Sequence, residues 1–367
     1  MNQKSHKWLT GLRIVLAIAW KDILEGWKNK VILTSVITSL FLVIFYYYLP
    51  DLTNDGLPLM VIFDPNNHIT NEETSCITDF NHRVEKVQET FYYAIRDMDT
   101  PVIGIALEQD PLQYQSDSPF VLEGYYPNWM KPYQKVSIKT SAERTLERCW
   151  GIPVEIAAGG NIVYPIMDNN TYGKIFIATA GLLLQLTVMG LSMGPQIIVE
   201  EKEARTLQAV VVSPANLGHF ILGKTLAVLF YTILTTTIGL IFVGSLIIHW
   251  GLALAALVIG MLTVVTPGIL LGVLIQNKQQ ITIWMWVIFL PTMLPIFFSI
   301  VRELPAPLMK IIDWWPTVAL ARMLRAGFTL NPPTNTYSIE MIYLVFLSLL
   351  FFLITLLVIR RQREKGV

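Results

Sequence analysis

Residues 225–277 read TLAVLFYTILTTTIGLIFVGSLIIHWGLALAALVIGMLTVVTPGILLGVLIQN, a stretch without a single Asp, Glu, Lys or Arg. About 20 consecutive apolar residues suffice for a helix to cross the hydrocarbon core of a bilayer. The stretch is too long for one such helix, and His249–Gly251 offer a turn near its middle. It therefore predicts a tight hairpin of two membrane-spanning helices, Thr225–Ile248 and Leu252–Ile275.

The composition of the whole chain is that of an integral membrane protein. Of 367 residues, 53% are hydrophobic and only 15% are charged, with a mean hydropathy of +0.50. A soluble domain carries about 25% charged residues. Four further apolar stretches predict the remaining spans: Val31–Leu49, Ile175–Val199, Ile281–Val301 and Met341–Ile359. Six spans place both ends of the chain on one side of the membrane.

The basic residues near the span ends indicate which side that is. Six lysines and arginines precede the first span, and the last span is followed by RRQREK at Arg360–Lys365. Cytoplasmic flanks are enriched in Lys and Arg, so we expect both termini to be cytoplasmic in a bacterial inner (plasma) membrane. Residues 50–172 and 302–340 would then face outside. The second of these segments holds Arg322 and Arg325 among four cations, which is unusual for an outer segment.

Residues 1–30 precede the first span and contain TGLRIVLAIAWKDILEGWKNK from Thr10 onward. This pattern predicts an amphipathic helix along the inner membrane surface, with Trp20 and Trp27 at the interface. Arg13 leaves too short an apolar run for a cleaved signal peptide.

The block at residues 50–172 is acidic, with 8 Lys and Arg against 18 Asp and Glu. Short apolar runs such as LMVIF and PVIGIAL alternate with stretches of helical character, which predicts a small mixed α/β domain. Both cysteines, Cys76 and Cys149, lie in this block. If the block is extracytoplasmic, a disulfide between them is favoured; the alternative is two unpaired thiols in a small core. The block shows no spacing typical of a metal site or a catalytic nucleophile.

The predicted fold is an α-helical integral membrane protein with six transmembrane helices, an N-terminal amphipathic interface helix and a mixed α/β extracytoplasmic domain between the first and second spans. After the first span (31–49) and the outer domain (50–172), a five-helix region covers 173–359. It includes a cytoplasmic loop at 200–224 and an outer hairpin at 302–340, and a basic tail follows at 360–367.

Residues 218–225, GHFILGKT, match the phosphate-binding pattern G-x-x-x-x-G-K-[ST]. The four intervening residues are bulky and mostly apolar, and the helix that follows runs directly into an uncharged span. The cytoplasmic stretch of roughly 25 residues is far too short for the core of a nucleotide-binding domain. We therefore interpret the match as the beginning of the third span, with Lys224 at the membrane surface.

The residues before this match, EEKEARTLQAVVVSPANL from Glu200 onward, carry more information. They resemble the permease subunits of type-2 ABC exporters, whose loop between the second and third spans reads like E-[KR]-E-x-G-T-L-[DE]-x-L-L-V-[ST]-P with a Gly-Lys pair further on. The resemblance extends over nearly the whole chain, although Arg205 stands where the family often has Gly. It implies that this loop docks on a separate ATPase subunit. The residues expected to carry the coupling are Glu200, Glu201, Lys202, Glu203, Arg205, Thr206, Ser213 and Pro214. The alternative interpretation is an ordinary solvated charge run that caps the second span.

The resemblance also implies the partners. Two ABC ATPase subunits would bind ATP and magnesium, and a second permease, identical or homologous, would complete the transporter. This chain itself is expected to be no enzyme, to bind no cofactor, metal or nucleic acid, and to contact membrane lipid. The expected function is export of an amphipathic or lipid-like substrate, such as a drug, antibiotic, lipid or glycan, from the cytoplasm.

Two other functions remain as alternatives. One is a membrane sensor or scaffold whose outer domain binds a ligand, and the other is an ion-coupled flippase. No charged residue lies near the middle of any predicted span, which argues against ion coupling because such transporters usually need ionisable groups within the membrane.

The second and fifth spans contain candidates for the substrate path or for a dimer interface. Gly190 and Gly194 form a GxxxG pattern that permits close helix packing, as do Gly268 and Gly272 in the fourth span. Prolines kink membrane helices, and the resemblance implies that the second and fifth spans line a cavity between paired permeases. The remaining candidates are Pro195, Trp284, Pro291 and Pro295. The aromatic character of the fifth span suits a lipid-like substrate and bilayer lipid equally.

Overall fold

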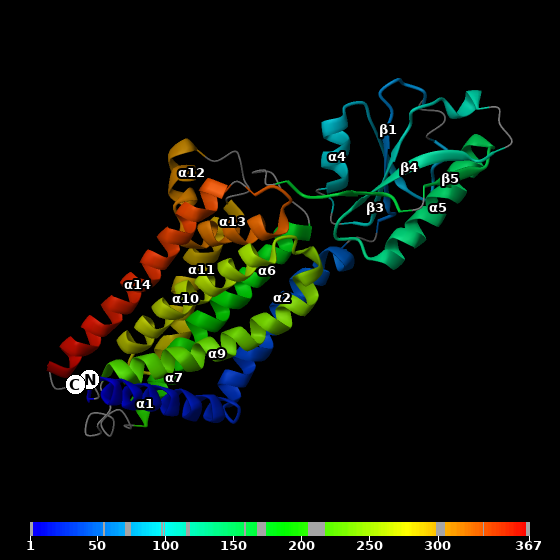
Figure 1. The fold of residues 1–367 in the computed structure, drawn as a ribbon. Helices are drawn as coiled ribbons and strands as arrows, with labels where there is room; N and C mark the ends of the chain where they lie inside the picture. The colour runs from blue at the N-terminus through cyan, green and yellow to red at the C-terminus, as the bar shows by residue number, and fades with distance from the viewer. Residues whose placement is uncertain are drawn as a thin grey trace. The chain divides into compact units, whose positions relative to one another are not determined.

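The computed structural model describes residues 3–53, 56–69, 75–96, 98, 100–114, 118–157, 159–166, 174–204, 217–298, 305–332 and 334–364. The chain divides into two compact units, each described here by itself (Figure 1). The helical unit comprises Met1–Tyr46, Ala178–Gly327 and Pro333–Val367. The second unit, which contains the β-sheet, comprises Tyr47–Ile177 and Phe328–Pro332.

Among the described residues, six helices are long and apolar enough to cross a membrane, which confirms the predicted number of spans. They are α2 (Lys30–Thr53), the continuous helix α6–η2–α7 (Lys174–Val188, Met189–Met193 and Gly194–Glu203), α9 (Leu217–Val243), α10 (Trp250–Leu274), α11 (Lys278–Phe298) and α14 (Thr334–Glu364). The uncharged stretch at 225–277 forms most of α9 and all of α10, with a short 3₁₀ turn, η3 (Gly244–Leu246), before α10.

The α10 helix lies at the centre of the helical unit. It packs against α7, the π-helical segment η2, α9 and α14. The α11 and α14 helices bury little of their surface, so apolar side chains cover their outer faces. Exposed apolar helix faces are expected where lipid, rather than water, surrounds the protein.

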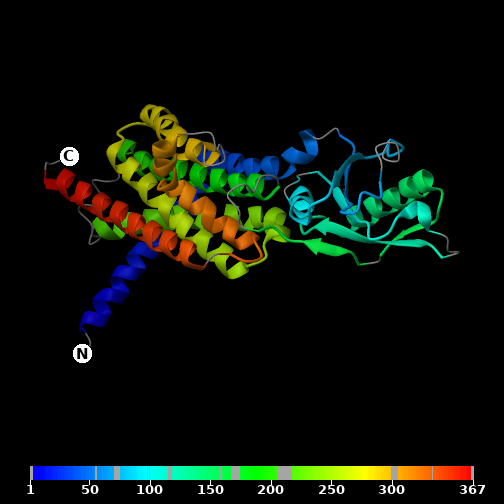
Figure 2. The same ribbon diagram turned by 90° about the horizontal axis from the view of Figure 1, so that it is seen from above.

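The N-terminal helix α1 (Gln3–Gly26) packs along α9. Its buried stripe recurs at helical spacing and faces α9 through Val15, Ala19 and Ile23, and it also includes Asp22. Figures 1 and 2 show α1 and the C-terminal end of α14 at the same end of the helical unit. A second apolar stripe on α1 stays exposed: Leu12, Leu16, Trp20, Leu24 and Trp27.

At the other end of this unit, the segment between α11 and α14 forms two short helices, α12 (Ala306–Asp313) and α13 (Pro316–Phe328). Arg322 on α13 pairs with Asp313 and, at 3.1 Å, with Glu340 on α14. One of the cations that looked unusual in the sequence is thus neutralised within the protein.

The second unit contains a six-stranded sheet in the order β2-β1-β3-β4-β5, with β6 also paired to β4. The strands are β1 (Leu59–Phe63), β2 (Asn81–Glu85), β3 (Val102–Ala106), β4 (Phe120–Pro127), β5 (Val154–Ile156) and β6 (Asn161–Val163). β1 pairs in parallel with β2 and β3, and β4 runs antiparallel to β3. The central strands β1 and β3 are nearly continuous apolar runs because both of their faces are buried.

Among the described residues of the second unit, helices α4 and α5 and one short turn accompany the sheet. The α4 helix (Gln88–Arg96) packs on β1, β3 and β4, and Gly104 in β3 leaves room for Phe91 and Ile95. The α5 helix (Pro132–Trp150) packs on β3 and β5, and η1 (Pro111–Gln113) precedes β4. A mixed α/β unit between the first and second spans is therefore present.

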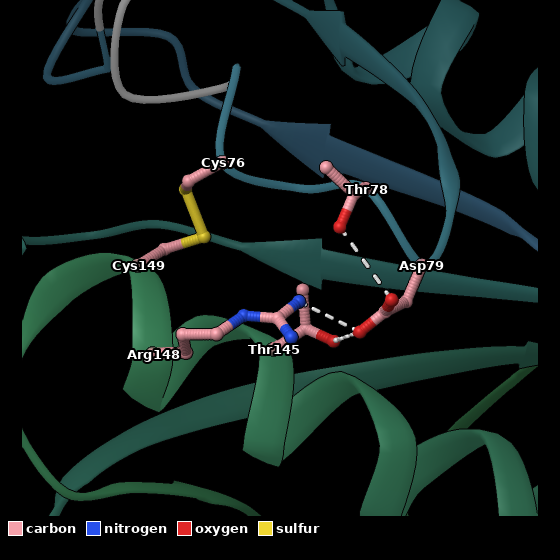
Figure 3. The surroundings of a disulfide bond; sticks show 6 residues. All are labelled: Cys76, Thr78, Asp79, Thr145, Arg148 and Cys149. Atoms are coloured by element: carbon pink, nitrogen blue, oxygen red, sulfur yellow. Dashed lines mark hydrogen bonds and ion pairs between the residues drawn. A yellow bond between two sulfur atoms is a disulfide. The ribbon is translucent and has the colours of Figure 1, made fainter.

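A disulfide joins Cys76 to Cys149, with 5.6 Å between the Cα atoms (Figure 3). Beside it, Asp79 accepts hydrogen bonds from Thr145 Oγ1 at 3.2 Å and from Arg148 at 2.7 Å. The hydrogen bond from Arg148 holds the pKa of the Asp79 carboxyl below its usual value. Covalent and polar contacts together fix the segment before β2 to the last turns of α5.

Candidate functional site

The EEKE segment, Glu200–Glu203, forms the last turn of α7 at the end of the second span. The sequence predicted a loop at 200–224, but the helix continues through Glu203 and α9 begins at Leu217. Glu and Lys are good helix formers, so the charged residues extend the span instead of leaving it. The predicted coupling residues Arg205, Thr206, Ser213 and Pro214 lie in 205–216, outside the described residues.

Glu201 belongs to a buried cluster of charges that includes Lys224 of the phosphate-loop-like motif. Lys224 Nζ donates to Asp22 Oδ1 and to Glu201 Oε1, each at 2.8 Å. Lys21 Nζ donates to the same Glu201 oxygen at 3.1 Å. The cluster therefore joins α1, α7 and α9 and contains two cations and two carboxylates.

Lys224 is buried within the protein beneath α1, and its place at the membrane surface stays a prediction. Its side chain is only 1% exposed, because α1 covers the beginning of α9. A buried ammonium group is costly unless it is paired and hydrogen-bonded, and Asp22 and Glu201 meet that requirement. Burial raises the pKa of the Asp22 carboxyl, and the positive charge of Lys224 opposes this rise.

The Lys202 side chain reaches α10 and caps the C-terminus of that helix. Lys202 Nζ donates to the backbone carbonyls of Gly272 at 3.0 Å, Val273 at 2.6 Å and Ile275 at 2.8 Å. The last carbonyls of a helix lack partners within it and carry partial negative charge. Lys202 satisfies these carbonyls and thereby ties the end of the second span to the end of the fourth.

Glu200 and Glu203 contact the beginnings of the first and fifth spans. Asn29 Nδ2, just before α2, donates to Glu200 Oε1 at 2.6 Å. The backbone N–H of Lys278 donates to Glu203 Oε1 at 3.1 Å, so this carboxylate lies at the N-terminus of α11, where a negative charge is favourable. Lys278 Nζ lies 3.7 Å from Glu200 and 3.6 Å from Glu203.

The EEKE segment is therefore a point of contact for α1, α2, α9, α10 and α11. The sequence suggested a run of charges available to a partner, whereas the structure directs these side chains toward other helices of the same chain. Across the part of the chain that the structure describes, no group of three or more His, Cys, Asp and Glu side chains is arranged to hold a metal ion. The arrangement is suited to the mechanical connection of helices.

The two GxxxG pairs contact each other within the chain. A Cβ atom added to Gly268 would lie 2.0 Å from the Gly190 carbonyl oxygen, and one added to Gly194 would lie 2.8 Å from the Gly268 carbonyl carbon. Gly190, Gly194 and the adjacent Pro195 are buried. Within the chain these three residues seat α10 against the second span, and their part in a dimer interface or substrate path stays a prediction.

The second span is π-helical over Met189–Met193, a segment that contains Gly190 and ends just before Gly194. Such wide turns in an otherwise α-helical segment often mark functional positions. Pro195 follows directly and, lacking an N–H, cannot complete the usual bond to a carbonyl one turn back. The second span is thus irregular where it contacts α10 most closely.

The fifth span, α11, contains Pro291 and Pro295 within its helix, and its side chains are largely exposed. Trp284 is 47% exposed in the described structure. Thr317 Oγ1 donates to the backbone carbonyl of Thr292 at 2.6 Å, which links α13 to this proline-containing part of α11. Trp284, Pro291 and Pro295 stay candidates for a substrate path or a permease interface.

Sequence reasoning missed Lys21, Asn29 and Lys278 as partners of the EEKE segment, and it missed Asp22 as a partner of Lys224. One signal was present, because Asp22 interrupts the apolar stripe of α1 next to Ile23. A carboxylate within an apolar stripe needs a buried cation. The sequence alone does not indicate which of its lysines comes near.

Six apolar spans, with a mixed α/β unit between the first two and a charged helix end that contacts five other helices, define a multi-pass membrane protein. The chain belongs to the ABC-2 family transporter proteins, whose sequence profile matches residues 30–357. This confirms the resemblance to ABC transporter permease subunits and implies association with ABC ATPases. Comparisons with curated proteins and with solved structures gave no match.

Proposed function

We propose that this chain is the permease subunit of an ATP-driven exporter. It would work with two ABC ATPase subunits and a second permease, identical or homologous. The substrate would be amphipathic or lipid-like and would leave the cytoplasm by alternating access. ATP and magnesium would bind to the ATPase, and the permease would supply the path.

The observation that carries this proposal is the set of contacts made by the EEKE segment. The segment begins the predicted coupling loop at 200–224, and only Ala204 separates it from residues 205–216. A force applied to that loop by an ATPase would reach Glu203 first. Rigid connections through Lys202 and Lys224 would then pass the displacement to α10, α9 and α1. Packed helices with salt-bridge connections are able to transmit such displacements.

The exposed apolar face of α11 suits a lipid-like substrate and bilayer lipid equally, and we assign it to the substrate as part of this proposal. Trp284 and Trp286 are 47% and 57% exposed, and Phe297 and Phe298 lie near the opposite end of the helix. In the proposed transporter, this helix would line the path between the two permeases. Aromatic side chains accommodate apolar ligands without requiring a charged partner.

The two apolar stripes of α1, one exposed and one buried against α9, support its placement at the inner membrane surface. The apolar stripe that includes Trp20 would enter the lipid, while the opposite stripe packs on α9. Cations near the polar side of α1, such as Arg13 and Lys28, would face anionic headgroups. Both chain ends would then be cytoplasmic, and the sheet-containing unit would be outside.

Cysteine labelling tests orientation and coupling together, because both native cysteines are bonded to each other. A Gln113→Cys variant should react with a membrane-impermeant maleimide in intact cells, and a Ser213→Cys variant should react only after permeabilisation. A photocrosslinker on Ser213→Cys should capture the ATPase, and the same crosslinker on Gln113→Cys should not. The orientation would be refuted if Ser213→Cys reacted in intact cells and Gln113→Cys reacted only after permeabilisation. The coupling loop would be refuted if the crosslinker at Ser213→Cys captured no ATPase.

Transport itself requires reconstitution. The complex purified from its source, placed in proteoliposomes, should move a fluorescent amphipathic substrate only with hydrolysable ATP. A complex whose ATPase lacks its phosphate-binding lysine is the control. ATP-independent movement at the same rate would exclude an ATP-driven exporter.

A further inference from the structure

A cavity of about 280 Å³ lies beside the EEKE segment, within the helical unit. Helix α1 and Asn29 form one wall, and the end of α7 forms another. Ala204, the last described residue before 205–216, also lines it. Lys21 and Glu25 border the cavity, and their side chains are 50% and 63% exposed, so this border reaches solvent.

The walls of the cavity carry more negative than positive charge. Four carboxylates line it, those of Asp22, Glu25, Glu200 and Glu201, and two lysines, Lys21 and Lys224. Lys278 offsets Glu200 from outside the cavity, at 3.7 Å. A concave site with low-dielectric walls concentrates ions of the opposite sign, so the cavity favours a cation.

One buried oxygen in this wall lacks a partner. Asp22 is 5% exposed, and its Oδ1 accepts from Lys224, but its Oδ2 has no hydrogen bond among the described residues. A buried carboxylate oxygen without a donor is unfavourable. A cation in the cavity would lower the electrostatic cost of this buried carboxylate and would also reduce the excess of negative charge.

We propose that this cavity receives a lysine or arginine side chain of the ATPase subunit. The inference rests on the proposed function for the identity of the partner. Its location supports that partner, because Ala204 connects the cavity wall directly to residues 205–216. An ammonium or guanidinium group fits the charge of the site, since it brings a positive charge and several N–H donors to a cavity lined by four carboxylates.

The preference for cations is tested on the permease alone with a reporter cysteine. Ala204→Cys places one free thiol at the cavity, because the native cysteines are paired. The rate of each reagent at Ala204→Cys is divided by the rate of the same reagent at Gln276→Cys. After this correction, we expect the cationic reagent methanethiosulfonate ethyltrimethylammonium to react about tenfold faster than the anionic ethylsulfonate reagent. The exposed Gln276 lies outside the cavity. High salt should reduce the ratio.

Two substitutions check that the wall carboxylates cause this preference. Glu25→Gln and Asp22→Asn, each combined with Ala204→Cys, should lower the cation-to-anion ratio. Glu25 is exposed, so its substitution keeps the test valid even if Asp22→Asn disturbs folding. An equal rate for both reagents in the parent, or a ratio unchanged by Glu25→Gln, would overturn the proposal.

The occupant is tested with the ATPase present. Assembly should slow the labelling of Ala204→Cys much more than that of Gln276→Cys, and Asp22→Asn with Glu25→Gln should weaken assembly at least about tenfold. If the ATPase assembles fully with that double variant, the cavity inference is wrong and the proposed function is untouched. If no ATPase assembles with the unmodified permease, the proposed function fails, and the ATPase side chain as occupant fails with it.

Discussion

At the scale of single residues, Lys224 is the cation whose loss should matter most. A Lys224→Met substitution leaves Asp22 and Glu201 without the ammonium group that both contact at 2.8 Å. Removal of one partner from a buried ion pair typically costs about 3–5 kcal/mol. We expect a destabilisation of this size, measured by denaturant unfolding in detergent micelles.

The matched control for this prediction is Lys278→Met. Lys278 also pairs with two carboxylates of the EEKE segment, but it is 53% exposed and its distances are 3.6 and 3.7 Å. Exposed pairs contribute about 0–1 kcal/mol, so this variant should unfold nearly as the parent does. Equal losses for both lysines would contradict the role assigned to burial.

The Asp22 carboxyl should also give a distinct pH dependence. Burial raises its pKa in the folded protein above the usual value, while Lys224, Glu201 and Lys21 are the charged groups around it. A raised folded pKa contributes stability that is present below the unfolded pKa and is lost as pH rises through the folded pKa. Relative to Asp22→Asn, the parent should therefore gain stability as pH falls toward about 4. Unfolding of both proteins between pH 7 and 4 measures this, and a difference that is constant with pH would contradict it.

At the scale of elements, the contact between the second and fourth spans depends on glycine. A methyl group at Gly268 would overlap the Gly190 carbonyl oxygen, and neither backbone can move without disturbing η2. Overpacked cores typically lose about 1–3 kcal/mol, occasionally more. We expect Gly268→Ala to lose stability at or above this range.

Gly251→Ala, at the beginning of the same α10 helix, is the control for Gly268→Ala. Nothing lies within 4 Å of the position that its Cβ would take. Because Ala has the higher helix propensity, this control should be neutral or slightly stabilising. If the two variants unfold alike, the close contact between α10 and the second span is not as described.

The spans were predictable because apolar length alone decides whether a helix crosses a bilayer. The contacts of charged residues at helix ends were not predictable in the same way. The sequence suggested that Glu200–Glu203 leave the membrane as a loop and that Lys224 lies at its surface. The helix continues through Glu203 because Glu and Lys are good helix formers, whereas the burial of Lys224 depends on α1 packing over α9, which no local pattern specifies. The two glycine pairs could be found in the sequence. That they pack against each other follows only from the packing of α10 on the second span.

At the scale of the whole molecule, the sheet-containing unit is inserted between the first and second spans and has a core of its own. Its single disulfide closes a long loop, since Cys76 and Cys149 are 73 residues apart. In the chain-entropy account, a bridge over a loop of that length contributes about 4 kcal/mol by restricting the unfolded chain. The exposed Arg148–Asp79 pair beside it is too weak to replace that contribution.

We therefore expect Cys76→Ser with Cys149→Ser to lower the stability of this unit by about that amount while the helical unit keeps its own unfolding transition. Proteolysis of the purified protein should cut the sheet-containing unit at a lower denaturant concentration in the variant. Reducing agent should move the parent to the same midpoint and leave the variant unchanged, which separates the bridge from the effect of serine. If instead both units unfold together at the lower midpoint, the two are one cooperative body and the division of the molecule into independent units is wrong.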